Sequence, residues 1–101
     1  MICRHWRGLV RPECPDAYIE HLRTRTFPQL SRIPGFQGVS LMRRTLPAGV
    51  EFVVQTIWES LESIVAFAGQ DAEVAVVPDE ARRMMVEYDG RARHYEVVLQ
   101  R

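Results

Sequence analysis

Four hydrophobic stretches, each bounded by turn-forming proline or glycine residues, indicate β-strands along the chain. The first is rich in aromatic and branched side chains, which favour the extended backbone. Strands are expected over Ile2–Val10, Gly38–Leu46, Val50–Trp58 and Arg91–Gln100. The segment Pro47-Ala48-Gly49 is short enough to join the second and third strands as a hairpin.

Apolar residues at spacings of three and four predict helices between these strands. The first helix opens at Pro15-Asp16, and Pro28 is expected to kink or divide it. Ser60 can cap the second helix, and Gly69 can end it. A short third helix is expected over Pro78–Met85. The apolar stripes comprise Tyr18, Ile19, Leu22, Thr26 and Leu30 in the first helix, and Leu61, Ile64, Val65 and Ala68 in the second.

The order of elements is β-α-β-β-α-β, with an extra helical piece before the last strand. This order predicts an α+β fold of the ferredoxin-like type, with a four-stranded antiparallel sheet and helices on one face. In that topology the first and third strands are central, and the last strand pairs with the first. The length of 101 residues fits a single domain, residues 1–101.

The third predicted strand is apolar on both of its faces. Phe52, Val54 and Trp58 lie on one face, whereas Val53 and Ile57 lie on the other. Helices can cover only one of these faces, and a large exposed apolar patch is rare in a monomer. We therefore expect a homodimer in which the two sheets pack face to face.

The charge balance excludes several classes of partner. Thirteen basic and thirteen acidic side chains give no net charge, so no general attraction to nucleic acid or to an anionic membrane is expected. The pairs Arg43-Arg44 and Arg82-Arg83 are interpreted as solvated surface charges. No apolar run approaches the ~20 residues of a membrane helix, and the first residues do not form a signal peptide.

The cysteines and the motif content suggest a cytoplasmic protein without a bound metal or cofactor. Cys3 and Cys14 are expected to be free thiols, and neither has the spacing of a zinc ligand. The chain contains no P-loop and no GxGxxG fingerprint, which argues against a self-contained flavin or nicotinamide enzyme.

Three segments carry a family resemblance. The run Thr56-Ile57-Trp58-Glu59-Ser60-Leu61-Glu62-Ser63-Ile64, followed by Phe67-Ala68-Gly69, resembles the antibiotic biosynthesis monooxygenase superfamily, in which a Trp-Glu-Ser turn leads into the second helix. Ile33-Pro34-Gly35-Phe36-Gln37-Gly38 is similar to the family's Pro-Gly turn, and His94-Tyr95-Glu96-Val97 to its closing strand. The resemblance implies a dimeric α+β barrel with a cavity between sheet and helices.

The same resemblance leaves the chemistry open, because the family includes cofactor-independent oxygenases, quinol monooxygenases, haem-degrading enzymes and proteins without assigned activity. The haem-degrading members use an Asn on the first strand, a Trp in the second helix and an axial His about ten residues later. This chain has no Asn, and the other two positions hold Phe67 and Val77. Haem degradation is therefore the least favoured reading, although haem binding through another His stays open.

Histidine is the natural base for cofactor-free oxygenation, because it titrates near neutral pH. His94 on the last strand and His5 on the first are the candidate catalytic residues, and their strands should be neighbours. The alternative is that each is a surface or dimer-interface His with ordinary hydrogen bonds.

Aromatic side chains and one arginine are candidates for substrate binding. Trp58 could form a cavity wall and stack on an aromatic ligand, or it could anchor the core. Arg43 could hold an anionic phenolate, or it could face solvent. The remaining candidate wall residues, which could equally be plain core, are Tyr18, Phe36, Phe67 and Tyr88.

Two functions are consistent with the sequence. The first is a monooxygenase without a bound cofactor that acts on an aromatic or quinone-like small molecule. The second is a non-catalytic homodimeric module that binds a small molecule or assists another enzyme. The space between sheet and helices should separate them: an enzyme needs a cavity with convergent polar groups, whereas a structural module would fill that space with side chains.

Overall fold

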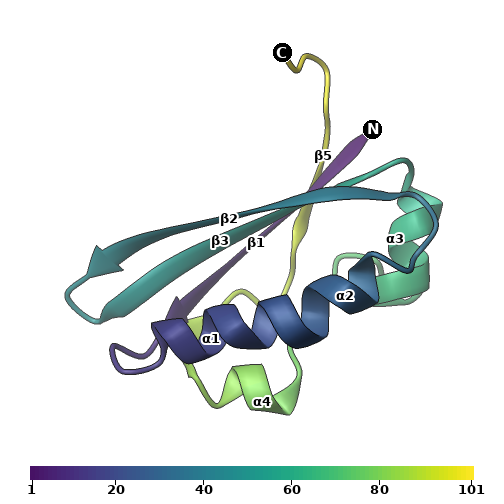
Figure 1. Cartoon of the computed structure of the whole chain (residues 1–101). Coiled ribbons are helices and arrows are strands. Elements are labelled where there is room, and N and C mark those ends of the chain that lie inside the picture. Colours follow the sequence, from purple (N-terminus) through teal and green to yellow (C-terminus); the bar gives the residue numbers. More distant parts are fainter.

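The computed structural model describes residues 1–101 and contains one antiparallel sheet with its helices on a single face (Figure 1). The strands run in the order β2-β3-β1, and both β4 and β5 pair with β1 at the far edge. The elements are β1 (Ile2–Val10), α1 (Pro15–His21), η1 (Leu22–Thr26), α2 (Phe27–Leu30), β2 (Phe36–Leu46), β3 (Gly49–Trp58), α3 (Leu61–Ala68), α4 (Asp79–Arg82), β4 (Met85–Tyr88) and β5 (Arg93–Glu96). The predicted ferredoxin-like α+β fold is confirmed.

The predicted last strand, Arg91–Gln100, corresponds to β5 alone, and β4 is an additional strand that was not predicted from the sequence. β4 pairs with the segment from Gly8 to Val10, and β5 pairs with the segment from Ile2 to His5. Between them the chain turns away from the sheet at Asp89, whose carbonyl accepts a 2.8 Å hydrogen bond from the indole of Trp6. Two predicted boundaries are therefore wrong: Met85 starts a strand rather than ending a helix, and the closing strand stops at Glu96.

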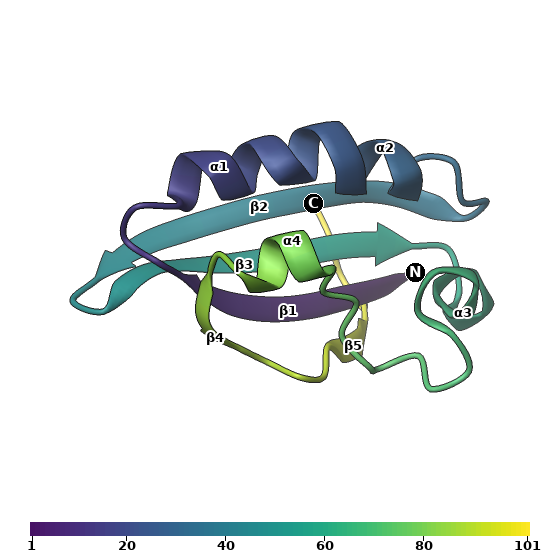
Figure 2. The same cartoon turned by 90° about the horizontal axis from the view of Figure 1, so that it is seen from below.

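Side chains with even numbers on β1 and β3 face the helices. The register pairs Trp6 with Val54 and Val10 with Val50, so both central strands contribute to the same apolar layer. Figure 2 shows α1, α2 and α4 lying over this face, with α3 at one end. The two core clusters are Val10, Tyr18, Leu22, Val50, Phe52, Ala81 and Met85, and Leu30, Trp58 and Ile64. None of the helices has the length and apolar character needed to cross a membrane.

The first helical segment runs from Pro15 to Leu30 and contains one wide turn. Residues Leu22–Thr26 adopt π-helical geometry, in which the N–H of Phe27 bonds to the carbonyl of Leu22, five residues earlier. Pro28 follows immediately and has no N–H to donate to the helix. The break predicted at Pro28 thus takes the form of a π-turn just before it, a feature often found at functional sites.

Candidate functional site: a pocket between sheet and helices

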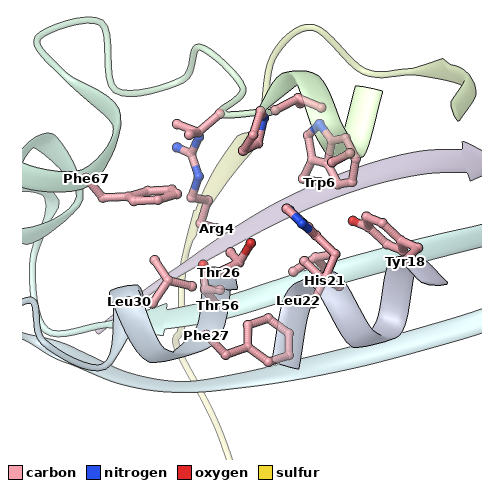
Figure 3. Close-up of a pocket in the computed structure, with 15 residues that line it drawn as sticks. Arg4, Trp6, Tyr18, His21, Leu22, Thr26, Phe27, Leu30, Thr56 and Phe67 are labelled. Carbon is pink, nitrogen blue, oxygen red and sulfur yellow. The ribbon is translucent and has the colours of Figure 1, made fainter. Parts of the chain in front are cut away.

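The π-turn borders a pocket between the sheet and the helical layer (Figure 3). The pocket has a free volume of about 70 Å³, is partly open to solvent and is lined mainly by hydrophobic side chains. Val54 forms part of its floor, Phe27 and Leu30 part of its helical wall, and Val76 and Val77 part of its rim. Among these apolar groups lie three buried polar side chains, Arg4 from β1, His21 from α1 and Thr56 from β3.

Arg4 is a buried cation whose partners are neutral. Only 5% of the residue is exposed. Its Nη1 donates to the carbonyl of Ala72 and contacts Nε2 of His94 at 2.8 Å, and its Nη2 donates to the carbonyl of Val74 at 2.9 Å. The guanidinium also lies 5.8 Å from the ring centroid of Phe67. Burial lowers the pKa of Arg4, although Glu73 opposes this shift through its negative charge.

The contact between Arg4 and His94 fixes the tautomer of the imidazole. A guanidinium has no acceptor, so Nε2 of His94 must accept and its proton must reside on Nδ1. Burial lowers the pKa of His94, the charge of Arg4 lowers it further, and Glu73 partly offsets both effects. The arrangement therefore favours the neutral form of His94.

His21 is the second buried polar group of the pocket, and it has no hydrogen-bond partner at either ring nitrogen. The residue is 6% exposed. The carboxylate of Glu80 is 3.6 Å from Nδ1, beyond hydrogen-bonding distance. An unsatisfied buried polar group destabilises a fold and calls for an explanation. A ligand in the pocket would supply the missing partner.

Local backbone features position the side chains around this pocket. The π-turn lets His21 and Thr26, five residues apart, face the same space. On the sheet, Gly8 makes room for the indole of Trp6, since a Cβ at that position would lie 2.6 Å from Cη2 of Trp6. Burial raises the pKa of the Tyr18 hydroxyl far above its usual range, so that this group at the pocket wall stays protonated.

The structure brings two of the predicted site residues, Tyr18 and Phe67, to the pocket. Trp58 is fully buried in the core, where its indole donates to the hydroxyl of Thr56 at 2.8 Å and its ring packs between Phe36 and Phe67. The other predicted residues lie elsewhere: Phe36 packs against Trp58, Tyr88 against Trp6, and Arg43 is exposed on β2.

The two predicted histidines lie on opposite faces of the sheet. Their strands are neighbours, as expected, but the register pairs Arg4 with His94 and His5 with Arg93. His94 therefore shares the helical face with Arg4. His5 lies on the open face, where Nδ1 is 3.1 Å from the amide nitrogen of Gln55 and the ring is 6.3 Å from that of Tyr95. Neither histidine lines the pocket.

Arg4 and His21 were not among the residues predicted from the sequence, although the pattern contained them both. Arg4 occurs two residues from Ile2 and two from Trp6, which places a charge in the apolar face of a central strand. His21 follows Tyr18 by three residues and so shares its helical stripe. A polar residue in phase with an apolar stripe is the feature that could have identified each of them.

The chain belongs to the antibiotic biosynthesis monooxygenase family, whose model matches residues 1–82. No curated protein matches the sequence. Solved structures with the same fold include a protein from Nitrosomonas europaea described as an antibiotic biosynthesis monooxygenase. It has 15% sequence identity and a TM-score of 0.71, and the match covers 98% of this chain and 100% of that one.

Two further solved structures contain ligands. A monooxygenase from the gene ActVA-Orf6 of Streptomyces coelicolor, in complex with nanaomycin D, is 17% identical with a TM-score of 0.58, covering 99% of this chain and 92% of that one. A mutant of MhuD with two manganese protoporphyrin IX molecules bound per active site is 25% identical with a TM-score of 0.63, covering 99% and 97%. The family thus supports a monooxygenase-like or small-molecule-binding role for this chain.

The pocket does not fit haem in the manner of the haem-degrading members. Phe67 and Val77 occupy the positions compared with that pattern, and both line the pocket. Neither side chain can coordinate iron. The free volume of about 70 Å³ is also far smaller than the ~300–1,000 Å³ of pockets that hold drug-sized ligands.

Proposed function

We propose that the protein is a monooxygenase that works without a bound cofactor on a small phenol or quinol held in this pocket. The observation that carries the proposal is His21, whose two ring nitrogens are buried without a partner in a mainly apolar pocket. A phenolic hydroxyl is the complementary group, because it can donate its proton to an imidazole nitrogen.

The size of the pocket favours a single ring over a polycyclic compound. A cavity of about 150 Å³ is known to hold benzene, and the free volume here is about 70 Å³. One ring can therefore enter only if it extends toward the open side or if the rim at Val76 and Val77 moves outward. These two residues belong to no helix or strand and make no backbone hydrogen bond, so a small displacement breaks no regular secondary structure.

The proposed reaction converts a phenol and O₂ into a quinone and water. His21 accepts the hydroxyl proton, and the resulting phenolate is a better electron donor to O₂ than the phenol. One oxygen atom then replaces hydrogen on the ring carbon opposite the hydroxyl and becomes a carbonyl. The other oxygen leaves as water with the two hydrogens lost from the O–H and C–H bonds. The apolar walls limit the access of bulk water to the phenolate.

Oxygen uptake with a panel of single-ring phenols and hydroquinones tests this function. We expect one quinone formed per O₂ consumed from a phenol, and one labelled oxygen in the product when ¹⁸O₂ is supplied. A protein that binds members of the panel but consumes no O₂ is the non-catalytic small-molecule binder, and the monooxygenase proposal is then wrong.

The role of His21 is tested with His21→Leu. Turnover should fall by about 10²-fold or more, the contribution typical of a general base. The free energy of unfolding should rise by ~1 kcal/mol, since leucine removes the unsatisfied buried nitrogens. A folded, more stable and inactive variant excludes loss of structure as the cause.

The predicted catalytic roles of His5 and His94 are tested in the same assay by replacing each with alanine. Unchanged turnover in a variant removes that histidine from the mechanism.

We also propose that the protein is a homodimer and that it works in the cytoplasm. The helices leave one face of the sheet uncovered, and this open face could pack against the same face of a second copy (Figure 1). The location is supported by Cys3 and Cys14, both of which are free thiols.

A further inference from the structure

We infer that the ligand of the pocket carries a carboxylate that pairs with the guanidinium of Arg4, which makes it a single-ring hydroxyaromatic acid. The inference rests on the proposed function in placing a phenolic ligand in this pocket, and it adds the charge of that ligand. Three observations support it: the uncompensated charge of Arg4, its unused donors, and the position of His21 across the pocket.

The charge of Arg4 has no ion-pair partner in the protein. Its polar contacts are two backbone carbonyls and the neutral ring of His94. Glu73 acts on it only at longer range, because its carboxylate is oriented to accept from the backbone N–H of His94 at 3.3 Å. None of the ion pairs of the chain includes Arg4. A buried charge without a counter-ion is costly, and an anionic ligand would compensate it.

The guanidinium also retains hydrogen-bonding capacity. It has five N–H donors, and the three recorded contacts use two on Nη1 and one on Nη2. The N–H of Nε and the second N–H of Nη2 have no acceptor. Carboxylates commonly bind arginine through two parallel hydrogen bonds, and such charge-assisted bonds are stronger than those between neutral groups. Arg4 can therefore recognise a carboxylate without giving up the contacts that hold the segment at Ala72 and Val74.

Arg4 and His21 reach the pocket from opposite layers. Arg4 projects from β1 on the sheet, and His21 projects from α1 on the helical side (Figure 3). A ligand that contacts both needs two polar ends separated by an apolar body. A benzene ring with a carboxylate at Arg4 and a hydroxyl at His21 has this form, and the ring would lie among Trp6, Phe27 and Phe67.

Calorimetric titration with a matched pair of ligands tests the inference without relying on turnover. The probes are 3-hydroxybenzoate and 3-hydroxybenzamide, which share size and shape but differ in charge near neutral pH. We expect the acid to bind about tenfold tighter or more, because only the acid offers Arg4 an anion. Equal affinities, or binding of neither probe, would overturn the inference.

Substitutions of Arg4 test whether the preference for the acid over the amide depends on this residue. Arg4→Gln keeps a donor for the carbonyls of Ala72 and Val74 but removes the charge, so the acid and the amide should bind with affinities within about twofold. Arg4→Lys retains the charge and should retain part of the preference, which matters if the glutamine variant does not fold. Arg93→Gln is the control: this exposed arginine lies on the open face of the sheet, so the preference should persist.

The two proposals fail in different ways. If the acid binds preferentially but no phenol in the panel drives O₂ uptake, the anion site stands and the monooxygenase function is wrong. If neutral phenols are oxidised and the acid has no advantage in binding, the function stands and the carboxylate is wrong. A preference that survives Arg4→Gln in a folded protein also contradicts the inference, because it places the anion elsewhere.

Discussion

At the scale of the residue, one hydrogen bond joins the pocket to the closing strand. His94 accepts from Arg4 only while its Nε2 is unprotonated. Protonation would place a second positive charge 2.8 Å from the guanidinium and would set two donors against each other. Burial and the charge of Arg4 both lower the pKa of His94 below its usual value of 6.5. The contact is therefore a pH-sensitive part of the fold.

This contact predicts the direction in which stability changes with pH. In the unfolded chain His94 binds a proton below pH 6.5, whereas in the folded chain it resists protonation until a lower pH. The contribution of the neutral His94 is thus fully present above pH 6.5 and is lost as the pH falls through the lowered pKa. Thermal melts of wild-type protein and His94→Gln across this range measure the effect.

The comparison between variants isolates His94 from the other titrating groups. Glutamine can still accept from Arg4 but does not titrate, so we expect a smaller loss of stability below pH 6.5 than in the wild type. His5→Gln, on the opposite face, should keep the wild-type profile. Identical profiles for wild type and His94→Gln would show that the Arg4 contact does not control the titration of His94.

For these residues, the sequence predicts which strands are neighbours but not which side chains meet. The neighbouring positions of the first and last strands could be predicted from the order of elements. The face of the sheet on which His5 and His94 lie could not be predicted, because a shift of one residue in register exchanges the two faces of a strand. Arg4 could have been found from its phase with Ile2 and Trp6 on β1. Its neutral partners at Ala72 and Val74 are about seventy residues away in sequence and required the structure.

At the scale of the element, Gly35 connects the start of β2 to the start of α3. Its φ of 93° lies in the left-handed region that favours glycine. Its carbonyl accepts a 2.7 Å hydrogen bond from the N–H of Glu59, and an added Cβ would clash with the side chain of Ser63. Because α3 carries Phe67 to the pocket, this turn also helps to position the site.

Gly35→Ala should therefore destabilise the fold strongly. The positive φ costs an L-residue ~1–2 kcal/mol, and the collision with Ser63 adds to this unless that side chain rotates. We expect the free energy of unfolding in urea to fall by about 2 kcal/mol or more. Gly90→Ala is the control, since a Cβ there meets nothing within 4 Å. Equal losses in the two variants would mean that the turn at Gly35 is not under this constraint.

The predictions for elements near the middle of the chain agree closely with the structure, whereas the prediction for the last strand does not. The cap at Ser60 and the stop at Gly69 lie where their local chemistry predicted them. The additional strand β4, which was not predicted, depends instead on tertiary contacts, since the indole of Trp6 bonds to the carbonyl of Asp89 directly after it. Local propensity does not contain this information, and short strands are easily misassigned without it.

At the scale of the whole molecule, the uncovered face of the sheet has a polar end and an apolar end. At the polar end Glu51 bonds to Arg7 at 2.5 Å and to Arg44 at 2.6 Å. The apolar end is formed by the cross-strand neighbours Ile57, Cys3 and Tyr95. A second apolar pair, Met42 and Val53, lies beyond the polar pair His5 and Gln55. The C-terminal residues leave the sheet on this same side, with Val98 86% and Leu99 75% exposed (Figure 1).

The apolar end of this face predicts the oligomeric state, because burying it against a second copy removes water from both the sheet and the C-terminal residues. Light scattering on the wild-type protein should give twice the 11.7 kDa of one chain. Ile57→Glu places a charge in the apolar end and should give the mass of one chain, since a buried unpaired carboxylate is costly. Leu61→Glu, at an exposed position on α3 away from this face, should remain a dimer. A wild-type monomer at micromolar concentration would refute the dimer and leave an exposed apolar sheet face that this fold does not explain.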